Sequence, residues 1–263
     1  IIHKPLDPIE LMLRIRNIAR SKALGDFPQD VQDMRRLLRK TKNELDHSLT
    51  DVILRLCWVA EHCDADVPDH LRRISRFSRF VAEKMGRSES ELHLIERASP
   101  MHDIGKTGVP DAILSKPGPL TADEYEFAKT HTTIGADILL GSDIPFVQMA
   151  ERIARYHHEK WDGTGYPEGL AGEQIPWEAR IVAVVDVFDA LATPRCYKEA
   201  LPIERCLEIV REGSGKHFDP DVASVILDTF QQSTCNNRTH RYIKGENYLL
   251  SVDKREWGRE IQE

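Results

Sequence analysis

An adjacent histidine and aspartate, His102 and Asp103, stand at the end of an apolar segment and are followed at once by Gly105 and Lys106. A neutral imidazole beside a carboxylate is a common starting point for binding a first-row metal ion. Gly105 would let the chain leave a helix with a positive φ, and Lys106 would bring a cation to whatever the metal holds. For an isolated pair, however, the simpler explanation is a helix C-terminus, where the dipole favours an imidazole.

Further residues that could bind a metal ion occur on separate apolar segments of the chain. The full candidate set is His70, His102, Asp103, His131, His157, His158 and Asp186, with Asp66 nearby. A single histidine on an apolar helix face is usually a core residue with its own hydrogen-bond partner. Several on different helices each need such a partner, and one shared metal site would supply it for all of them.

The donor types indicate which metals and which chemistry such a site would support. Imidazole and carboxylate without thiolate suit iron, manganese, zinc or nickel, and Asp103 could bridge two ions. Two ions about 3.5–4 Å apart form the standard clamp for hydrolysing a phosphodiester, with a bridging hydroxide as the nucleophile.

Asp186 and Asp189 share a helix face. Arg195 and Lys198 would bring cations to the same mouth, suited to phosphate oxygens, although a solvated charged turn explains these two equally well.

Composition limits the class of protein that carries these residues. The chain has 263 residues, of which 41% are hydrophobic, enough for one sizeable core or for a domain plus an accessory helix. The formal net charge of −7 argues against binding DNA, RNA or an anionic membrane, although bound cations would still attract a small anionic substrate. Five cysteines without a C-x-x-C pair fit free thiols in the cytoplasm. We expect no membrane span and no signal peptide, and the start at Ile1 is typical of a fragment.

Helical periodicity dominates the chain and predicts an all-α fold. After Phe27 and Pro28 a long helix is expected, in which Val31, Leu38, Leu45, Val52 and Val59 recur every seven residues. This period indicates a coiled-coil-like helix and a parallel dimer. Leu49 and Leu56 suggest a shifted stripe, and packing on the protein's own domain explains the second half of the helix equally well.

The remaining helices are expected to form a bundle around the candidate ligands. Their ranges are 1–20, 68–86, 89–104, 121 to beyond His131 (opened by a Thr121–Glu124 capping box), 145–158, and helices from Pro176, Pro202 and Pro220. Residues 105–120 and 159–175 are expected to be loops because they are rich in glycine and proline. No alternating strand pattern occurs before residue 235, and residues 241–252 are the one candidate β-hairpin.

Three segments together resemble the HD-GYP family: HDIGK at His102–Lys106, HHEKWDGTGYPEGLAGEQIP at His157–Pro176, and ARIVAVVDVFDAL at Ala179–Leu191. The likeness spans roughly residues 60–230. Residues 1–20, with Lys4–Pro5, resemble the last strand-to-helix passage of a response-regulator receiver domain, and an ordinary N-terminal helix is the alternative. The resemblance implies a receiver-like tail (1–23), a linker and dimerisation helix (24–62), an HD-GYP metal phosphohydrolase domain (63–232) and a C-terminal extension (233–263).

The resemblance also implies an activity and residue roles. The expected function is metal-dependent hydrolysis of cyclic di-GMP to pGpG, GMP or both, as the output domain of a two-component response regulator. Two divalent ions are implied, iron or manganese first and zinc or nickel next: one at His70, His102, Asp103 and Asp186, and one at His131, His157 and His158 with Asp103 bridging. Lys106 would stabilise charge on the transferred phosphate, Gly165, Tyr166 and Pro167 form the GYP loop, and Arg195 and Lys198 would contact the dinucleotide. Asp189 would contact substrate or hydrogen-bond a ligating histidine.

Two departures from the family pattern affect these implications. Asp66 stands where some members have a glutamate, which puts a third metal ion in doubt, and it fits equally well as a helix N-cap before Pro68. Cys196 stands where the family usually has a proline between Arg195 and the following tyrosine. The loop that carries Arg195 would then be more mobile and substrate binding weaker.

Partners and competing functions follow from the same reasoning. The implied partners are an upstream receiver domain with its sensor kinase, a second copy bound through the linker helix, and a diguanylate cyclase bound at the GYP loop. One competing function is a non-hydrolytic module that binds cyclic di-GMP or a protein, and another is an HD-type nucleotide phosphohydrolase. The complete ligand set favours hydrolysis over the binding module. The GYP loop and the second histidine pair favour a dinucleotide over a simple nucleotide.

Overall fold

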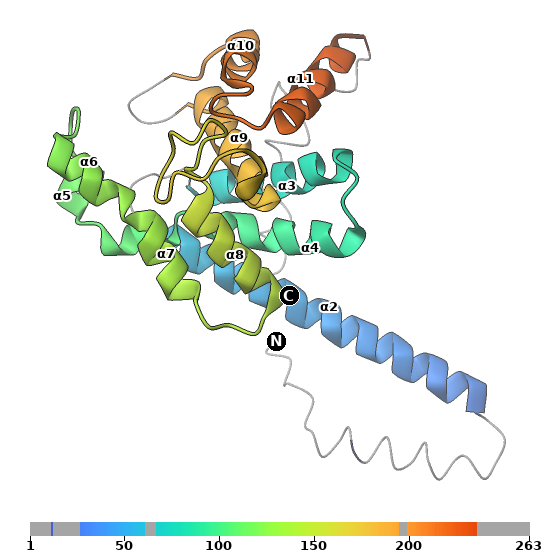
Figure 1. The fold of residues 1–263 in the computed structure, drawn as a ribbon. Helices are drawn as coiled ribbons and strands as arrows, with labels where there is room; N and C mark the ends of the chain where they lie inside the picture. The colour runs from blue at the N-terminus through green and yellow to red at the C-terminus, as the bar shows by residue number, and fades with distance from the viewer. Residues whose placement is uncertain (1–11, 13–26, 61–66, 195–198, 236–263) are drawn as a thin grey trace. The chain divides into compact units, whose positions relative to one another are not determined.

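A computed structural model of the chain describes residue 12 and residues 27–60, 67–194 and 199–235. These residues form helices and loops, and the only β-type pairings among them are two isolated bridges, which confirms the predicted all-α fold (Figure 1). No helix within the described ranges is both long enough and apolar enough to span a membrane. The predicted receiver-like helix in residues 1–20 and the candidate hairpin at 241–252 lie outside the described residues.

The first described helix, α2 (Phe27–Ala60), crosses the boundary between two compact units, which falls after Val52. In the first unit, Leu38 and Leu45 are exposed, and Leu49 is the least exposed of the three at 42%. In the second unit, the helix contributes the buried side chain of Cys57 to the core, whereas Leu56 stays exposed. The end of α2 therefore packs on the protein's own domain, whereas Leu38, Leu45, Val52 and Val59 of the seven-residue stripe stay exposed.

Four helices close a ring around the core of the second unit: α3 (Val67–Lys84), α4 (Glu89–Ala98), α8 (Pro145–Tyr156) and α9 (Trp177–Ala192). Helix α3 packs on α4 and α9, and α8 packs on the same two helices. The apolar side chains recur every three or four residues and are fully buried, as Leu71, Ile74 and Val81 show on α3. Burial of these amphipathic faces is the main force that holds the ring together.

The other helices cover this ring on two sides. Helices α10 (Ile203–Gly213) and α11 (Pro220–Cys235) pack on α9, and α11 also packs on α3. Helices α5 (Asp111–Leu114), α6 (Ala122–Lys129) and α7 (His131–Leu139) follow one another, and α7 packs on α8. The helices predicted to begin near Pro145, Pro176, Pro202 and Pro220 are confirmed to within a residue or two.

The predicted helix over residues 89–104 is wrong beyond Ala98. A proline inside a helix lacks an N–H donor and clashes with the carbonyl four residues earlier, so Pro100 ends α4. Two short 3₁₀ helices replace the expected continuation, η1 (Ser99–Met101) and η2 (Ile104–Gly108). His102 and Asp103 therefore lie between two tight turns and do not continue helix α4.

Gly105 does not adopt the positive φ that the sequence suggested, since it is absent from the glycines with left-handed backbone. Its role is close approach, because a Cβ atom there would lie 1.9 Å from the backbone oxygen of His131 and 2.4 Å from the nitrogen of Gly135. No side chain fits in that space. Gly105 thus lets the turn after Asp103 pack directly against the first turn of α7.

The single helix predicted from Thr121 past His131 is in fact two helices. The capping box between Thr121 and Glu124 opens α6 as predicted. Helix α6 ends at Lys129 and α7 begins at His131, and the side chain of Thr130 between them donates a hydrogen bond of 2.6 Å to the Phe127 carbonyl. Residues 105–120, predicted as loop, contain η2 and the one-turn helix α5, which are too short to leave a periodic apolar pattern.

Candidate metal centre

Four of the candidate histidines are anchored through their Nδ1 atoms. A carbonyl or carboxylate oxygen only accepts a hydrogen bond, so each Nδ1 carries the proton and each Nε2 carries the lone pair. The anchoring distances are 2.7 Å from His70 to Asp189 Oδ2, 3.0 Å from His102 to the Ser99 carbonyl, 2.7 Å from His131 to the Ala128 carbonyl, and 3.0 Å from His157 to the Ile153 carbonyl. All four imidazoles are therefore in the tautomer that binds a metal through Nε2.

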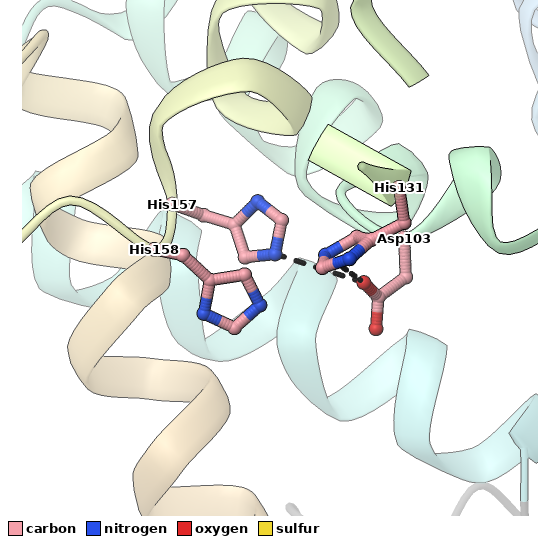
Figure 2. A group of neighbouring side chains, drawn as sticks. All are labelled: Asp103, His131, His157 and His158. Carbon is pink, nitrogen blue, oxygen red and sulfur yellow. Dashed lines mark ion pairs between the residues drawn. The ribbon is translucent and has the colours of Figure 1, made fainter. Parts of the chain in front are cut away.

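The first group of candidate ligands consists of Asp103, His131, His157 and His158, whose ligand atoms lie within 4.8 Å of one another (Figure 2). Asp103 Oδ1 lies 3.3 Å from His131 Nε2 and 3.6 Å from His157 Nε2. The rings of His157 and His158 are 4.1 Å apart between centroids. Asp103 directly precedes η2, His131 opens α7, and His157 and His158 follow α8. The close packing of Gly105 joins η2 to α7.

The second group consists of His70, His102 and Asp186, whose ligand atoms also lie within 4.8 Å of one another. Asp186 Oδ1 is 3.8 Å from the Nε2 atoms of both His70 and His102. Helices α3 and α9 supply His70 and Asp186, and the turn after η1 supplies His102. Residues separated by more than a hundred positions in the sequence thus converge on one place.

Asp103 lies between the two groups. Its Oδ1 atom faces the first group, whereas its Oδ2 atom is 3.3 Å from His102 Nε2 of the second group. The rings of His102 and His157 are 5.2 Å apart between centroids, so the groups adjoin. One carboxylate with an oxygen toward each group is the arrangement of a bridging ligand in a two-metal site.

Several polar atoms here are buried without a hydrogen bond. Within the described ranges, His131 Nε2, His157 Nε2 and Asp103 Oδ1 have no such partner. A buried polar atom left without a partner is costly, and few occur in a native protein. Three of them directed at one point fit a divalent cation, which would accept all three lone pairs at once. The nitrogen and oxygen donors, without thiolate, fit the expected ions.

The local electrostatics favour the protonation states that bind metal. Burial lowers the pKa of His131 to about 4 and also lowers that of His158 well below its usual range. Burial alone would raise the pKa of Asp103, but the positive charge of Lys106 beside it opposes burial, and that pKa lies well below its usual value. His131 and His158 are therefore neutral and Asp103 is ionised at neutral pH, as metal binding requires.

Comparison with known proteins agrees with this geometry. The sequence model of the HD domain matches residues 59–222. The chain belongs to the HD-domain family. It is 41% identical over 225 residues to the cyclic di-GMP phosphodiesterase response regulator RpfG of Xanthomonas campestris pv. campestris, covering 85% of this chain and 60% of that relative. It is 38% identical over 195 residues to 3′3′-cGAMP-specific phosphodiesterase 2 of Vibrio cholerae, covering 74% of this chain and 36% of that relative.

The chain thus spans less than two thirds of the length of either relative. Among solved structures, the fold is similar to that of a cyclic GMP-AMP specific phosphodiesterase of V. cholerae, with a TM-score of 0.56. That comparison covers 81% of this chain and 53% of the other, at 21% sequence identity, so it supports the fold alone. Together these findings place the two ligand groups inside an HD domain.

A buried network in the HD domain supports the second group. Asp189 Oδ2 accepts from His70, and Asp189 also accepts from the guanidinium of Arg73, at 2.5 Å to Oδ1 and 3.1 Å to Oδ2. Because both oxygens are engaged and the side chain is buried, the geometry favours Asp189 as the partner of a histidine over a contact with substrate. Arg73 was missed in the sequence, although an arginine between the buried Leu71 and Ile74 was a signal.

The GYP loop of the HD domain closes one side of the first group. The ring of Tyr166 stacks on His158 with centroids 4.8 Å apart, and its backbone N–H donates to the His158 carbonyl at 3.2 Å. Gly165 has no room for a side chain, because a Cβ atom would lie 2.3 Å from the Lys160 nitrogen. The Tyr166–Pro167 peptide is cis, and Pro167 is exposed.

Glu159 anchors this loop and was also missed in the sequence. Its buried carboxylate accepts three backbone N–H bonds, from Glu168 at 2.7 Å, Gly169 at 3.0 Å and Leu170 at 3.1 Å. Three charge-assisted bonds from consecutive residues fix the path of the chain directly after Pro167. A glutamate beside a histidine pair in a polar loop carries no periodic signal, so only the fold reveals its role.

Of the remaining predicted site residues, the structure describes Lys106 alone. Lys106 lies at the rim of the site, where its Nζ is 2.5 Å from Asp103 Oδ2 and its side chain is 34% exposed. Asp66, Arg195, Cys196 and Lys198 lie outside the described residues. Their predicted roles, as a ligand of a third metal ion and as contacts to the dinucleotide, stay predictions.

Proposed function

We propose that this HD domain is a metal-dependent phosphodiesterase that hydrolyses cyclic di-GMP to the linear dinucleotide pGpG, to GMP, or to both. The observation that carries the proposal is the pair of adjoining ligand groups that share Asp103. Such an arrangement suits phosphodiester hydrolysis. The name of the Xanthomonas relative, at 41% identity, supports cyclic di-GMP as the substrate.

The chain's own residues would divide the work as follows. Divalent ions bound by the two groups would activate a water molecule and polarise the scissile phosphate. Asp103 stays ionised and presents one oxygen to each group, while Lys106 holds a positive charge at the rim for the phosphate oxygens. Burial raises the pKa of Tyr166, and nearby Tyr125, Asp103 and Asp186 add to this effect, so the hydroxyl of the GYP loop remains a hydrogen-bond donor.

We further propose two divalent ions, with iron or manganese the first expectation and zinc or nickel the next. The donor set supports this choice, because imidazole and carboxylate without thiolate bind all four metals. One ion is assigned to His70, His102, Asp186 and Asp103, and the other to His131, His157, His158 and Asp103. A third ion would depend on Asp66.

A direct assay tests the proposed activity. The protein is purified without chelator, its metals are measured, and it is incubated with cyclic di-GMP under reducing conditions with iron(II) or manganese(II). Chromatography that resolves pGpG from GMP then reports turnover and the final product. A fully metallated protein that forms no linear product from cyclic di-GMP would contradict the proposal and favour the non-hydrolytic binding module.

A second candidate substrate is 3′3′-cGAMP, because the Vibrio relative that is 38% identical carries that specificity in its name. The same assay with 3′3′-cGAMP separates the two candidates through the ratio of their kcat/KM values. Turnover of 3′3′-cGAMP alone would reassign the substrate while leaving the metal chemistry in place. Cleavage of mononucleotides alone would instead favour the HD-type nucleotide phosphohydrolase.

We also propose that the domain acts in signalling through partners. The Xanthomonas relative is named as a response regulator, which supports an upstream receiver domain and sensor kinase. A diguanylate cyclase bound at the GYP loop is a further proposal. The division into residues 1–23, 24–62, 63–232 and 233–263 and a cytoplasmic location also stay predictions.

A second copy of the chain is proposed to bind along α2. The exposed side chains of Leu38, Leu45, Leu49, Val52 and Leu56 follow one another at spacings of seven, four, three and four residues. When Lys42 is counted between Leu38 and Leu45, the spacings alternate between four and three residues, as they do along a coiled-coil seam. This seam includes Leu49 and Leu56 of the shifted stripe. A stripe of this kind on a solvated helix needs an apolar partner.

A further inference from the structure

An aromatic side chain outside the predicted site lies beside the GYP loop. Tyr125 and Lys129 are four residues apart on α6 and therefore share one face of that helix. The Lys129 Nζ atom is 5.5 Å from the ring centroid of Tyr125 and 5.5 Å from that of Tyr166. Both rings lie within the distance of about 6 Å at which an ammonium is attracted to an aromatic face. The cation thus joins the two tyrosines.

These side chains connect to the candidate metal ligands. The Tyr166 ring stacks on His158 and lies edge-on to His131 at 6.5 Å between centroids. Helix α6 ends at Lys129, two residues before His131. A continuous row of side chains therefore leads from Tyr125 through Lys129 and Tyr166 to the first ligand group.

The outer end of this row is accessible to a ligand. Tyr125 is 51% exposed, although its ring is large and mostly apolar. Lys129 Nζ is paired with the Glu126 carboxylate at 2.7 Å, and that carboxylate is itself exposed. An ion pair with a solvent-exposed carboxylate contributes little, so a phosphate oxygen of a ligand can compete for the same ammonium.

We infer that Tyr125 and Lys129 form a binding surface for a purine base of the cyclic dinucleotide and for the sugar-phosphate edge beside it. The inference rests on the proposed function, because it takes one phosphate of the substrate to lie at the ligand groups. The bases of a cyclic dinucleotide extend away from its phosphates, and a base binds well on an exposed aromatic ring flanked by a cation. The row meets both requirements and is continuous with the site.

The same physics limits what this surface can discriminate. Stacking of a base on an aromatic ring tolerates any base, because every base has a π-face. Tyr125 therefore adds affinity for a purine without distinguishing guanine from adenine. Its loss should weaken cyclic di-GMP and 3′3′-cGAMP by the same factor, whichever of the two the enzyme prefers.

The experiment compares Tyr125→Ala with Phe127→Ala. Phe127 is a matched control, since it is a 44% exposed aromatic residue of the same helix, and a separation of two residues turns it to the other side. Each variant is assayed with cyclic di-GMP and with bis(p-nitrophenyl) phosphate, a phosphodiester that has no purine. Lys129→Met, which removes the charge and keeps the length of the side chain, is assayed in the same way.

The expected result is a rise in KM for cyclic di-GMP on the order of tenfold in Tyr125→Ala, with kcat unchanged. Lys129→Met should show a smaller rise, Phe127→Ala none, and none of the three should alter cleavage of bis(p-nitrophenyl) phosphate. An unchanged KM in Tyr125→Ala, or an equal loss with both substrates, would overturn the inference.

The failure of the proposed function is distinguishable from the failure of this inference. Wild-type protein that binds cyclic di-GMP without cleaving it would disprove the activity, and the Kd of cyclic di-GMP would then replace KM in the comparison. An unchanged Kd in Tyr125→Ala would still overturn the inference. Wild-type protein that neither cleaves nor binds cyclic di-GMP would overturn both.

Discussion

The two groups of candidate ligands are oriented by different means. In the first group, His131 and His157 donate their Nδ1 protons to carbonyls three or four residues earlier in the chain. In the second group, His70 donates to Asp189, which lies 119 residues further along the chain and is held in turn by Arg73. Backbone carbonyls close in the sequence thus orient His131 and His157 of the first group and also His102 of the second. His70 of the second group depends instead on a buried network between α3 and α9.

This difference implies that each group can be weakened without the other. Substitutions at sites that share no partner usually have additive effects, and the hydrogen bonds that hold His131 and His157 share no residue with those that hold His70. Asp103 is the exception, because one of its oxygens faces each group. Four predictions test the comparison, from the shared carboxylate to the outermost support.

The largest effect is expected for Asp103→Asn, which removes the negative charge shared by the two groups while keeping the volume of the side chain. Both ions should be lost together, and turnover of cyclic di-GMP should fall by about 10³-fold or more, since both functions of the metal pair are lost. Elemental analysis and product chromatography measure the two effects. Retention of one full equivalent of metal would show that the groups do not share this ligand.

Lys106→Met is expected to separate charge at the rim from metal binding. Both metals should remain, whereas kcat should fall by about 10²–10³-fold, the usual loss when one stabilising donor to a developing charge is removed. Lys116→Met is the matched control, because Lys116 also forms an ion pair, with Glu124, and neither residue belongs to a ligand group. Loss of metal in Lys106→Met would mean that the lysine acts by holding Asp103 ionised.

Asp189→Asn should weaken the second group alone. Removing an outer partner of a ligating histidine typically costs about 10–100-fold in metal affinity or activity, so one equivalent of metal should become easy to remove with a competing chelator. The other equivalent should stay bound. Loss of both would contradict the independence of the groups.

The control for Asp189→Asn is the stability of the fold, because the substitution also leaves the guanidinium of Arg73 buried beside a neutral amide. A lower Tm is therefore expected. Metal affinity should be compared at a temperature where circular dichroism shows the variant to be fully folded. Under that condition, a change in one equivalent of metal reports the second group and not global unfolding.

The features that sequence could predict are those encoded by neighbouring residues. Prolines near the first turn and apolar residues at helical spacing located α8, α9, α10 and α11, and the Thr121–Glu124 capping box located α6. The sequence likewise indicated the residues of the two groups, because histidines on apolar helix faces need polar partners. Each of these signals is local, so each survives without knowledge of the fold.

The features that sequence could not predict depend on distant contacts or on single short turns. Pro100 ended a helix that apolar periodicity extended to residue 104, and Gly105 serves a close approach to α7 that no local rule describes. Arg73 and Glu159 are charged residues whose partners are a distant carboxylate and three backbone N–H groups. The support of the ligand groups was therefore harder to predict than the ligands themselves.

Glu159→Gln is expected to have the smallest effect of the four and to act on the first group. The glutamine oxygen still accepts a backbone N–H, but its amide nitrogen is a donor and would face another N–H of the segment Glu168–Leu170. An unmade buried bond of this kind costs about 1–3 kcal/mol locally, so hydrogen exchange in that segment should speed up. KM for cyclic di-GMP should rise severalfold, because Tyr166 is less firmly held on His158.

The matched control for this substitution is Glu173→Gln, in the exposed part of the same loop. It removes an identical charge without touching the three backbone bonds, so exchange and KM should match the wild type. Metal content should be unchanged in both variants, since neither residue belongs to a ligand group. If Glu159→Gln loses metal from the first group, then the GYP loop supports the ligands directly, and the first group depends on a non-local carboxylate just as the second does.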